Sequence, residues 1–152
     1  AFLYLKFERY FKFCFVRNPL DRIVSIYEYL KNGGNKKGDL YLTELIRNKY
    51  PTFDEFVLDY LDKDVINEHI LFKPQYLFIY DFKYELQVDF VGKFENLKED
   101  YEFICSEIGV PFNLPFKNKS FRSDYKEYYL NENVSEKIFE LYKKDFLFFD
   151  YK

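Results

Sequence analysis

A run of β-forming residues that leads straight into a well-capped helix is the feature that most constrains this fold. Residues 11–16 read Phe-Lys-Phe-Cys-Phe-Val and predict a mostly buried strand. Asn18 can cap the following helix, Pro19 suits its first position because no hydrogen bond is lost there, and Asp21 favours its first turn. The glycines at 33–34 end this helix. Its apolar residues recur at helical spacing: Leu20, Ile23, Val24, Tyr27 and Leu30.

Later segments continue the alternation of strands and helices. Residues 52–55 have a capping-box pattern that begins a helix, and residues 87–91 suggest a strand closed by the next glycine. Two further helices are predicted at 95–108 and 134–146. The fold is therefore expected to be α/β, with a small, mostly parallel sheet flanked by helices. No repeat or linker divides residues 1–152, so a single domain is expected.

The charge distribution argues against a general nucleic-acid binder and indicates a local anion site. The net charge is −3, whereas nucleic-acid binding relies on a basic surface. Residues 1–50 hold 10 basic and 5 acidic residues, and residues 51–152 hold 13 and 21. A basic first third suits one bound anion, although chance clustering on solvated helix faces would give the same counts. No apolar run approaches the ~20 residues of a membrane span, so no transmembrane segment is expected in this chain.

The residues that usually bind metals are few and scattered. The chain has one histidine, His69, and two cysteines, Cys14 and Cys105. These residues do not have the spacing of a metal-ligand cluster, so no metal site is expected. Each cysteine lies in an apolar segment, which predicts two buried, reduced thiols.

The junction between the first strand and its helix carries the clearest chemistry. Arg17 follows the strand directly, at the edge of the sheet where α/β proteins bind ligands. Ser25 lies on the helix face opposite the apolar stripe, near Arg22. Arg17 and Ser25 could together hold one phosphate group, and the helix N-terminus would favour its charge. The alternative is an arginine that pairs with a helix-start carboxylate and a serine that faces water.

The residues around this junction resemble a known family. The segment from Phe15 to Tyr27 is similar to the 3′-phosphate-binding segment of carbohydrate sulfotransferases, which use 3′-phosphoadenosine 5′-phosphosulfate (PAPS). The family hallmark, Arg-x-Pro-x-x-Arg-x-x-Ser, is matched by Arg17, Pro19, Arg22 and Ser25. Further similar segments follow in the family's order: Asn67–Gln75, Asp89–Glu95 with Asn118–Ser120 and Tyr125–Tyr129, and Tyr142–Tyr151.

The resemblance implies the fold, the reaction and part of the site. It implies a P-loop-NTPase-like α/β fold and transfer of a sulfuryl group from PAPS to a carbohydrate hydroxyl, with no metal. It places Arg17 and Ser25 on the 3′-phosphate of the donor, with Arg22 of the same motif in the donor site. Glycans or other hydroxyl-bearing molecules are the implied acceptors.

Two further assignments concern residues outside the hallmark. The loop with Lys119, Ser120 and Arg122 is basic and polar, which suits a lid over the donor or a sulfated sugar, although an ordinary solvated loop has the same composition. His69 is the candidate general base because imidazole exchanges a proton near neutral pH. A structural histidine, or one that positions a substrate, is the alternative.

The sequence departs from the family at one important place. The family's first strand ends in a Pro-Lys-x-[Gly/Ala]-[Thr/Cys]-[Ser/Thr] loop that holds the 5′-phosphosulfate, and these 152 residues lack one. We expect an N-terminally truncated fragment that lacks its first strand-loop-helix unit and is inactive alone. The alternative is a non-catalytic nucleotide- or glycan-binding module. The family is membrane-associated, which implies the Golgi lumen for a eukaryotic chain, whereas the cytoplasm is expected for a bacterial one.

Overall fold

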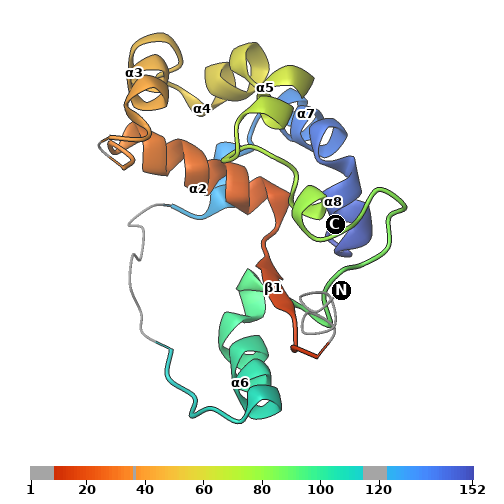
Figure 1. Ribbon diagram of the computed structural model, residues 1–152. Helices are drawn as coiled ribbons and strands as arrows, with labels where there is room; N and C mark the ends of the chain where they lie inside the picture. Colours follow the sequence, from red (N-terminus) through yellow and green to blue (C-terminus); the bar gives the residue numbers. More distant parts are fainter. Residues whose placement is uncertain (1–8, 36, 115–122) are drawn as a thin grey trace. The chain divides into compact units, whose positions relative to one another are not determined.

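The computed structural model describes residues 9–35, 37–114 and 123–152. Its backbone divides into two compact units (Figure 1). The first unit comprises Ala1–Arg17 and Leu77–Asn118, and the second comprises Asn18–Tyr76 and Lys119–Lys152. The boundary between Arg17 and Asn18 lies at the strand-to-helix junction that the sequence singles out.

The first unit is built on a two-stranded parallel sheet. Strand β1 (Phe13–Val16) pairs with β2 (Phe90–Lys93), with Phe13 opposite Phe90 and Phe15 opposite Gly92. A 3-10 turn and helix α6 (Leu97–Ile108) follow β2. Gly109 ends α6 in the left-handed conformation, with a φ of 69° that glycine adopts without steric cost. The sheet with its helix confirms the expected α/β class.

The second strand differs from its predicted bounds. The sequence predicted residues 87–91 with the glycine at its end, but β2 is Phe90–Lys93 and Gly92 lies within it. Asp89 sets the start of pairing, because its carboxylate accepts a hydrogen bond from the backbone N–H of Lys12 at 2.7 Å. Gly92 fits inside the strand because the ring of its partner Phe15 occupies the space that a side chain would need.

The second unit is helical. Its described elements are α2 (Pro19–Lys31), α3 (Leu40–Lys49), α4 (Phe53–Glu55), the π-helical turn η1 (Phe56–Tyr60), α5 (Lys63–Glu68), the 3-10 turn η4 (Tyr125–Tyr128), α7 (Glu132–Leu141) and α8 (Lys143–Phe148). The 3-10 turn η2 (Gln75–Phe78) begins in this unit and ends in the first. Among the described helices, none combines the length and hydropathy needed to cross a membrane.

Helix α2 forms as its sequence predicts. The side chain of Asn18 accepts a hydrogen bond from the N–H of Leu20 at 2.9 Å, and Pro19 occupies the first position. The capping box of α4 is also present, because Thr52 and Glu55 exchange hydrogen bonds. Both helix starts therefore depend on contacts between residues close in sequence.

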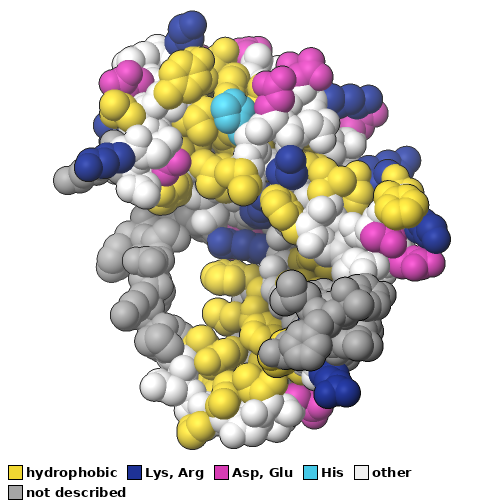
Figure 2. All heavy atoms as spheres, in the orientation of Figure 1, with side chains coloured by type: hydrophobic (Ala, Val, Ile, Leu, Met, Phe, Trp, Pro, Cys, Tyr) yellow, Lys and Arg dark blue, Asp and Glu magenta, His cyan; other side chains and the backbone are white. Residues whose placement is uncertain are grey.

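One continuous apolar core fills the second unit. Tyr27 packs against Phe53 and Phe56, with ring centroids 5.4 and 5.3 Å apart. The buried members of this core come from every long helix of the unit: Ile23, Val24, Tyr27, Leu30, Leu42, Ile46, Phe53, Phe56, Val57, Leu61, Ile66, Phe72, Val134, Ile138, Tyr142 and Phe146. Figure 2 shows that hydrophobic side chains also reach the visible surface, interspersed with charged ones.

The prediction of one continuous C-terminal helix at 134–146 was wrong. The structure has two helices, α7 and α8, separated at Tyr142. Tyr142 is buried, and its hydroxyl donates a hydrogen bond to the backbone carbonyl of Phe72 at 2.7 Å. Tyr142 thereby joins the end of α7 to the segment after α5, which helical periodicity could not indicate.

A buried carboxylate, Asp145, lies on α8. It is fully buried and accepts hydrogen bonds from the backbone N–H groups of Gln75 and Tyr76 at 2.7 and 2.8 Å. Burial raises the pKa of Asp145, and these two backbone hydrogen bonds oppose the rise. Asp145 therefore fastens the residues after Pro74 to the last helix.

We expect Gly92→Ala to destabilise the first unit by about 1–3 kcal/mol through overpacking. A Cβ at this position would lie 2.6 Å from the Phe15 ring. Urea unfolding of the variant measures the loss, with Gly38→Ala as the control because a Cβ there meets nothing within 4 Å. Equal stability of the two variants would contradict the close packing of Phe15 on Gly92.

We expect Asp145→Ala to lower the free energy of unfolding by about 3 kcal/mol, because two backbone donors lose their acceptor in a buried site. Thermal unfolding measures this effect. Asp59→Ala is the matched control, since Asp59 is exposed on η1. A loss no greater than that of the control would show that Asp145 does not fasten this segment.

Candidate functional site

The carboxyl end of β1 presents Arg17. Its guanidinium carbon lies 4.3 Å from the centroid of the Phe94 ring, which follows the last residue of β2. Such a contact over an aromatic face orients a guanidinium. The residues that follow the two strands, Arg17 and Phe94, therefore contact each other through a cation–π interaction.

Helix α2 begins at Pro19, after the cap residue Asn18, and carries the other three residues of the motif, Pro19, Arg22 and Ser25. Ser25 is half-buried on α2, while its neighbours Val24 and Tyr27 are buried in the core. This placement confirms that Ser25 lies outside the apolar stripe. Arg17 belongs to the first unit and Ser25 to the second. Their convergence on one phosphate therefore stays a prediction.

Arg22 lies in the first turn of α2 and points into the second unit. Its Nη2 donates a hydrogen bond to the backbone carbonyl of Leu71 at 2.8 Å. Burial lowers the pKa of Arg22, while the nearby Tyr142 and Asp145 oppose this change. Its Nη1 is buried and has no hydrogen-bond acceptor among the described residues. This N–H group could therefore donate a hydrogen bond to an oxyanion bound near the start of α2.

His69 lies at the end of α5. Its backbone N–H donates to the carbonyl of Val65 at 3.1 Å, and its own carbonyl accepts from Phe72 and Lys73 at 3.0 Å each. Its half-buried imidazole packs edge-on against the Phe72 ring, with centroids 6.1 Å apart. The backbone around His69 is well fixed, which suits either a structural or a chemical role for its ring.

The segment from Leu71 to Tyr76 links these residues. The backbone carbonyl of Leu71 accepts a hydrogen bond from the Arg22 guanidinium. The backbone N–H groups of Gln75 and Tyr76 donate hydrogen bonds to the carboxylate of Asp145. Asp145 was not predicted from the sequence as a functional or structural residue. A lone acidic residue directly before an apolar run, Phe146 to Phe149, is the signal that could have indicated a buried carboxylate.

The remaining predicted residues have different outcomes. Lys119, Ser120 and Arg122 lie outside the described residues. Cys14 and Cys105 are both free thiols, Cys105 buried and Cys14 half-buried, and burial raises the pKa of Cys14. Within residues 9–35, 37–114 and 123–152, no group of three or more metal-ligating side chains comes together.

Comparison with known proteins identifies relatives of this chain. Carbohydrate sulfotransferase 11 of Mus musculus is 28% identical over 96% of the chain and 48% of the relative. Carbohydrate sulfotransferase 14 of Danio rerio is 29% identical over 75% of the chain and 34% of the relative. An uncharacterized protein of Archaeoglobus fulgidus is 34% identical over 71% of the chain and 75% of the relative.

The chain spans about half the length of the mouse relative, 48%. No solved structure matches it. The family model described as the sulfotransferase family matches residues 4–152, which include nearly all of the first unit, the whole second unit and the Arg17–Ser25 motif. The chain therefore belongs to the sulfotransferase family.

Proposed function

We propose that this chain acts in the transfer of a sulfuryl group from PAPS to a hydroxyl of a carbohydrate. The family match and the carbohydrate sulfotransferases among its relatives support the reaction class. The observation that carries the proposal is the junction of β1 and α2, where Arg17 ends a strand and Asn18 and Pro19 begin a capped helix.

The residues at this junction fit an anionic nucleotide. Arg17 supplies a forked cation for a phosphate, and Ser25 supplies a hydroxyl donor. The buried Nη1 of Arg22, which has no acceptor among the described residues, favours a negatively charged group nearby. Lys119, Ser120 and Arg122, whose loop is basic and polar, are proposed to complete the donor site.

We propose a single P-loop-like domain that includes both units. The family match extends across the boundary between them. Parallel strands with a helix directly after β1 are the arrangement in which α/β proteins bind nucleotides. The proposed acceptor is a glycan.

The reaction requires that donor and acceptor are positioned, that negative charge on the donor is stabilised, and that a base accepts the proton of the acceptor hydroxyl. When bound, PAPS supplies the sulfuryl group, and the acceptor oxygen replaces the bridging phosphate oxygen on sulfur. Arg17 and Ser25 fix the donor through its 3′-phosphate, so that the acceptor can approach in line. His69 is proposed to take the proton of the acceptor hydroxyl. We propose no role for a metal ion in these steps.

We expect Arg17→Ala and Ser25→Ala each to weaken binding of adenosine 3′,5′-bisphosphate. A charge-assisted hydrogen bond is worth about 1.5–3 kcal/mol, so the arginine variant should bind roughly 10- to 100-fold more weakly. The serine variant should lose less, because its hydroxyl is neutral. Isothermal titration calorimetry measures both affinities.

Matched controls separate this effect from a general loss of charge. Arg9→Ala removes an exposed arginine before β1, and Ser135→Ala removes a serine on α7. Neither control should change the affinity by more than about twofold. Unchanged affinity in Arg17→Ala, with a normal unfolding temperature, would remove the basis of the proposed function.

We expect His69→Ala, introduced into active protein, to lower kcat by roughly 10²–10⁴-fold while KM for the donor changes little. A general base acts on the chemical step, whereas loss of a structural ring would lower stability first. His69→Gln, which keeps a polar side chain, separates the two cases. Normal turnover in both variants would exclude His69 as the base.

A further inference from the structure

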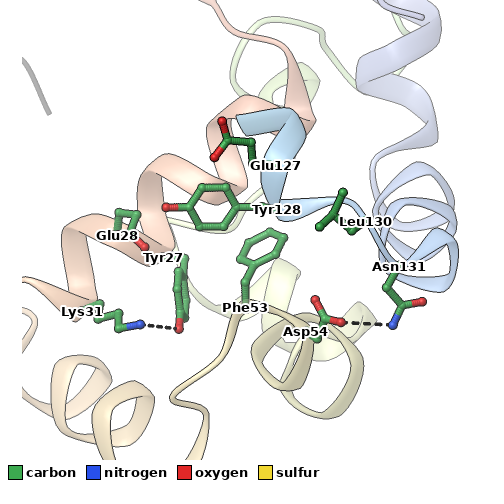
Figure 3. A pocket seen from close by; sticks show the side chains of 9 residues that line it. All are labelled: Tyr27, Glu28, Lys31, Phe53, Asp54, Glu127, Tyr128, Leu130 and Asn131. Atoms are coloured by element: carbon green, nitrogen blue, oxygen red, sulfur yellow. Dashed lines mark hydrogen bonds between the residues drawn. The ribbon is translucent and has the colours of Figure 1, made fainter. Parts of the chain in front are cut away.

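A pocket on the second unit has no role in the donor site. Its volume is about 590 Å³, which is within the range of small-molecule sites. Its lining comes from α2, α4, η4 and the residues that lead into α7 (Figure 3). The nine lining residues are Tyr27, Glu28, Lys31, Phe53, Asp54, Glu127, Tyr128, Leu130 and Asn131. Arg17, Ser25 and His69 are not among them.

Aromatic rings form one wall of this pocket. Tyr27 and Phe53 are almost fully buried, at 1% and 6% exposure, so they form a rigid base. Tyr128 is half-buried and stands at 82° to Phe53, with centroids 5.4 Å apart (Figure 3). A partly exposed ring held by buried rings offers a fixed apolar surface, on which the C–H face of a sugar can pack.

Polar side chains surround the rings. The Asn131 amide donates to the carboxylate of Asp54 at 3.1 Å, which fixes both groups. Lys31 donates to the Tyr27 hydroxyl at 3.3 Å and to the Pro51 carbonyl at 3.0 Å. The ammonium group thus has partners at the edge of the pocket, while the carboxylates keep acceptor sites for a ligand.

The charges of the lining select the kind of ligand. Glu28, Asp54 and Glu127 oppose the single cation of Lys31. An excess of carboxylates repels sulfate and phosphate groups, and it accepts hydrogen bonds from hydroxyl groups. The pocket therefore has the opposite preference to the proposed donor site, which takes a polyanion.

We propose that this pocket binds an unsulfated, uncharged sugar unit. The Tyr128 ring packs on the apolar face of the sugar, and the carboxylates and the Asn131 amide hold its hydroxyl groups. This assignment rests on the proposed function in one respect: it makes the bound sugar a unit of the acceptor glycan. A sulfated unit would be rejected here, so the pocket would favour regions of a glycan that are not yet modified.

The test compares two trisaccharides with the same backbone. Tri-N-acetylchitotriose is the neutral probe, and its 6-O-sulfated form is the anionic probe. Chemical-shift mapping on the chain should show the neutral probe at the amides of Tyr128 and Asn131. The sulfated probe should bind at least about fivefold more weakly at low salt, where the repulsion between its sulfate groups and the carboxylates of the pocket is least screened.

Two variants with matched controls identify the groups responsible. Tyr128→Ala should weaken binding of the neutral probe by roughly three- to tenfold. Glu127→Gln should strengthen binding of the sulfated probe by roughly two- to fivefold. The substitution should not disturb folding, because the Glu127 side chain is exposed. Tyr41→Ala and Glu44→Gln, which remove exposed side chains of α3, should change neither affinity.

The outcomes are distinct from those of the nucleotide titration. Shifts of the neutral probe outside the pocket, no binding of it, or tighter binding of the sulfated probe would each overturn the proposal. Nucleotide binding without sugar binding in the pocket would overturn this inference alone. Sugar binding in the pocket without nucleotide binding would keep a saccharide site and overturn the proposed function.

Discussion

The hydrogen bond that begins α2 is the constraint on which the other features depend. Asn18 accepts the N–H of Leu20 at 2.9 Å, and Pro19 fixes the first helical residue. This start places Ile23, Val24, Tyr27 and Leu30 in the core and leaves Ser25 outside it. The cap also follows directly on Arg17, the residue after β1, whose guanidinium meets the Phe94 ring. A shift of the helix start by one residue would rotate every side chain of α2 by about 100°.

A second constraint is the buried polar contact between distant segments. Asp145 binds the N–H groups of Gln75 and Tyr76, and Tyr142 binds the carbonyl of Phe72. Arg22 adds a hydrogen bond to Leu71. Buried polar groups are costly unless they are paired, so these contacts define one arrangement of the chain after His69. The candidate base thus lies beside a segment whose backbone is held by Arg22 of α2, by Tyr142 between α7 and α8, and by Asp145 of α8.

The two proposed binding regions have opposite charge preferences. The proposed donor region relies on Arg17 and on the buried Nη1 of Arg22, which has no acceptor within the part of the chain that the structure describes. The pocket at the other end of α2 is lined by three carboxylates and one ammonium group. Such a division suits the proposed function, because the proposed donor carries phosphates and the proposed acceptor carries hydroxyl groups. Helix α2 contributes residues to both regions.

The sequence by itself determined the features that depend on residues near one another in the chain. The cap of α2, the capping box of α4, the αL glycine after α6 and the Arg17–Ser25 motif are all of this kind, because their hydrogen bonds or spacings are local. Only the tertiary structure decided the register of β2, the break at Tyr142 and the burial of Asp145. It also brought Tyr27, Phe53 and Tyr128 to one pocket. These features depend on partners about 25 to 100 residues apart, whose contact is set by the packing of the whole unit and leaves no periodic trace in the sequence.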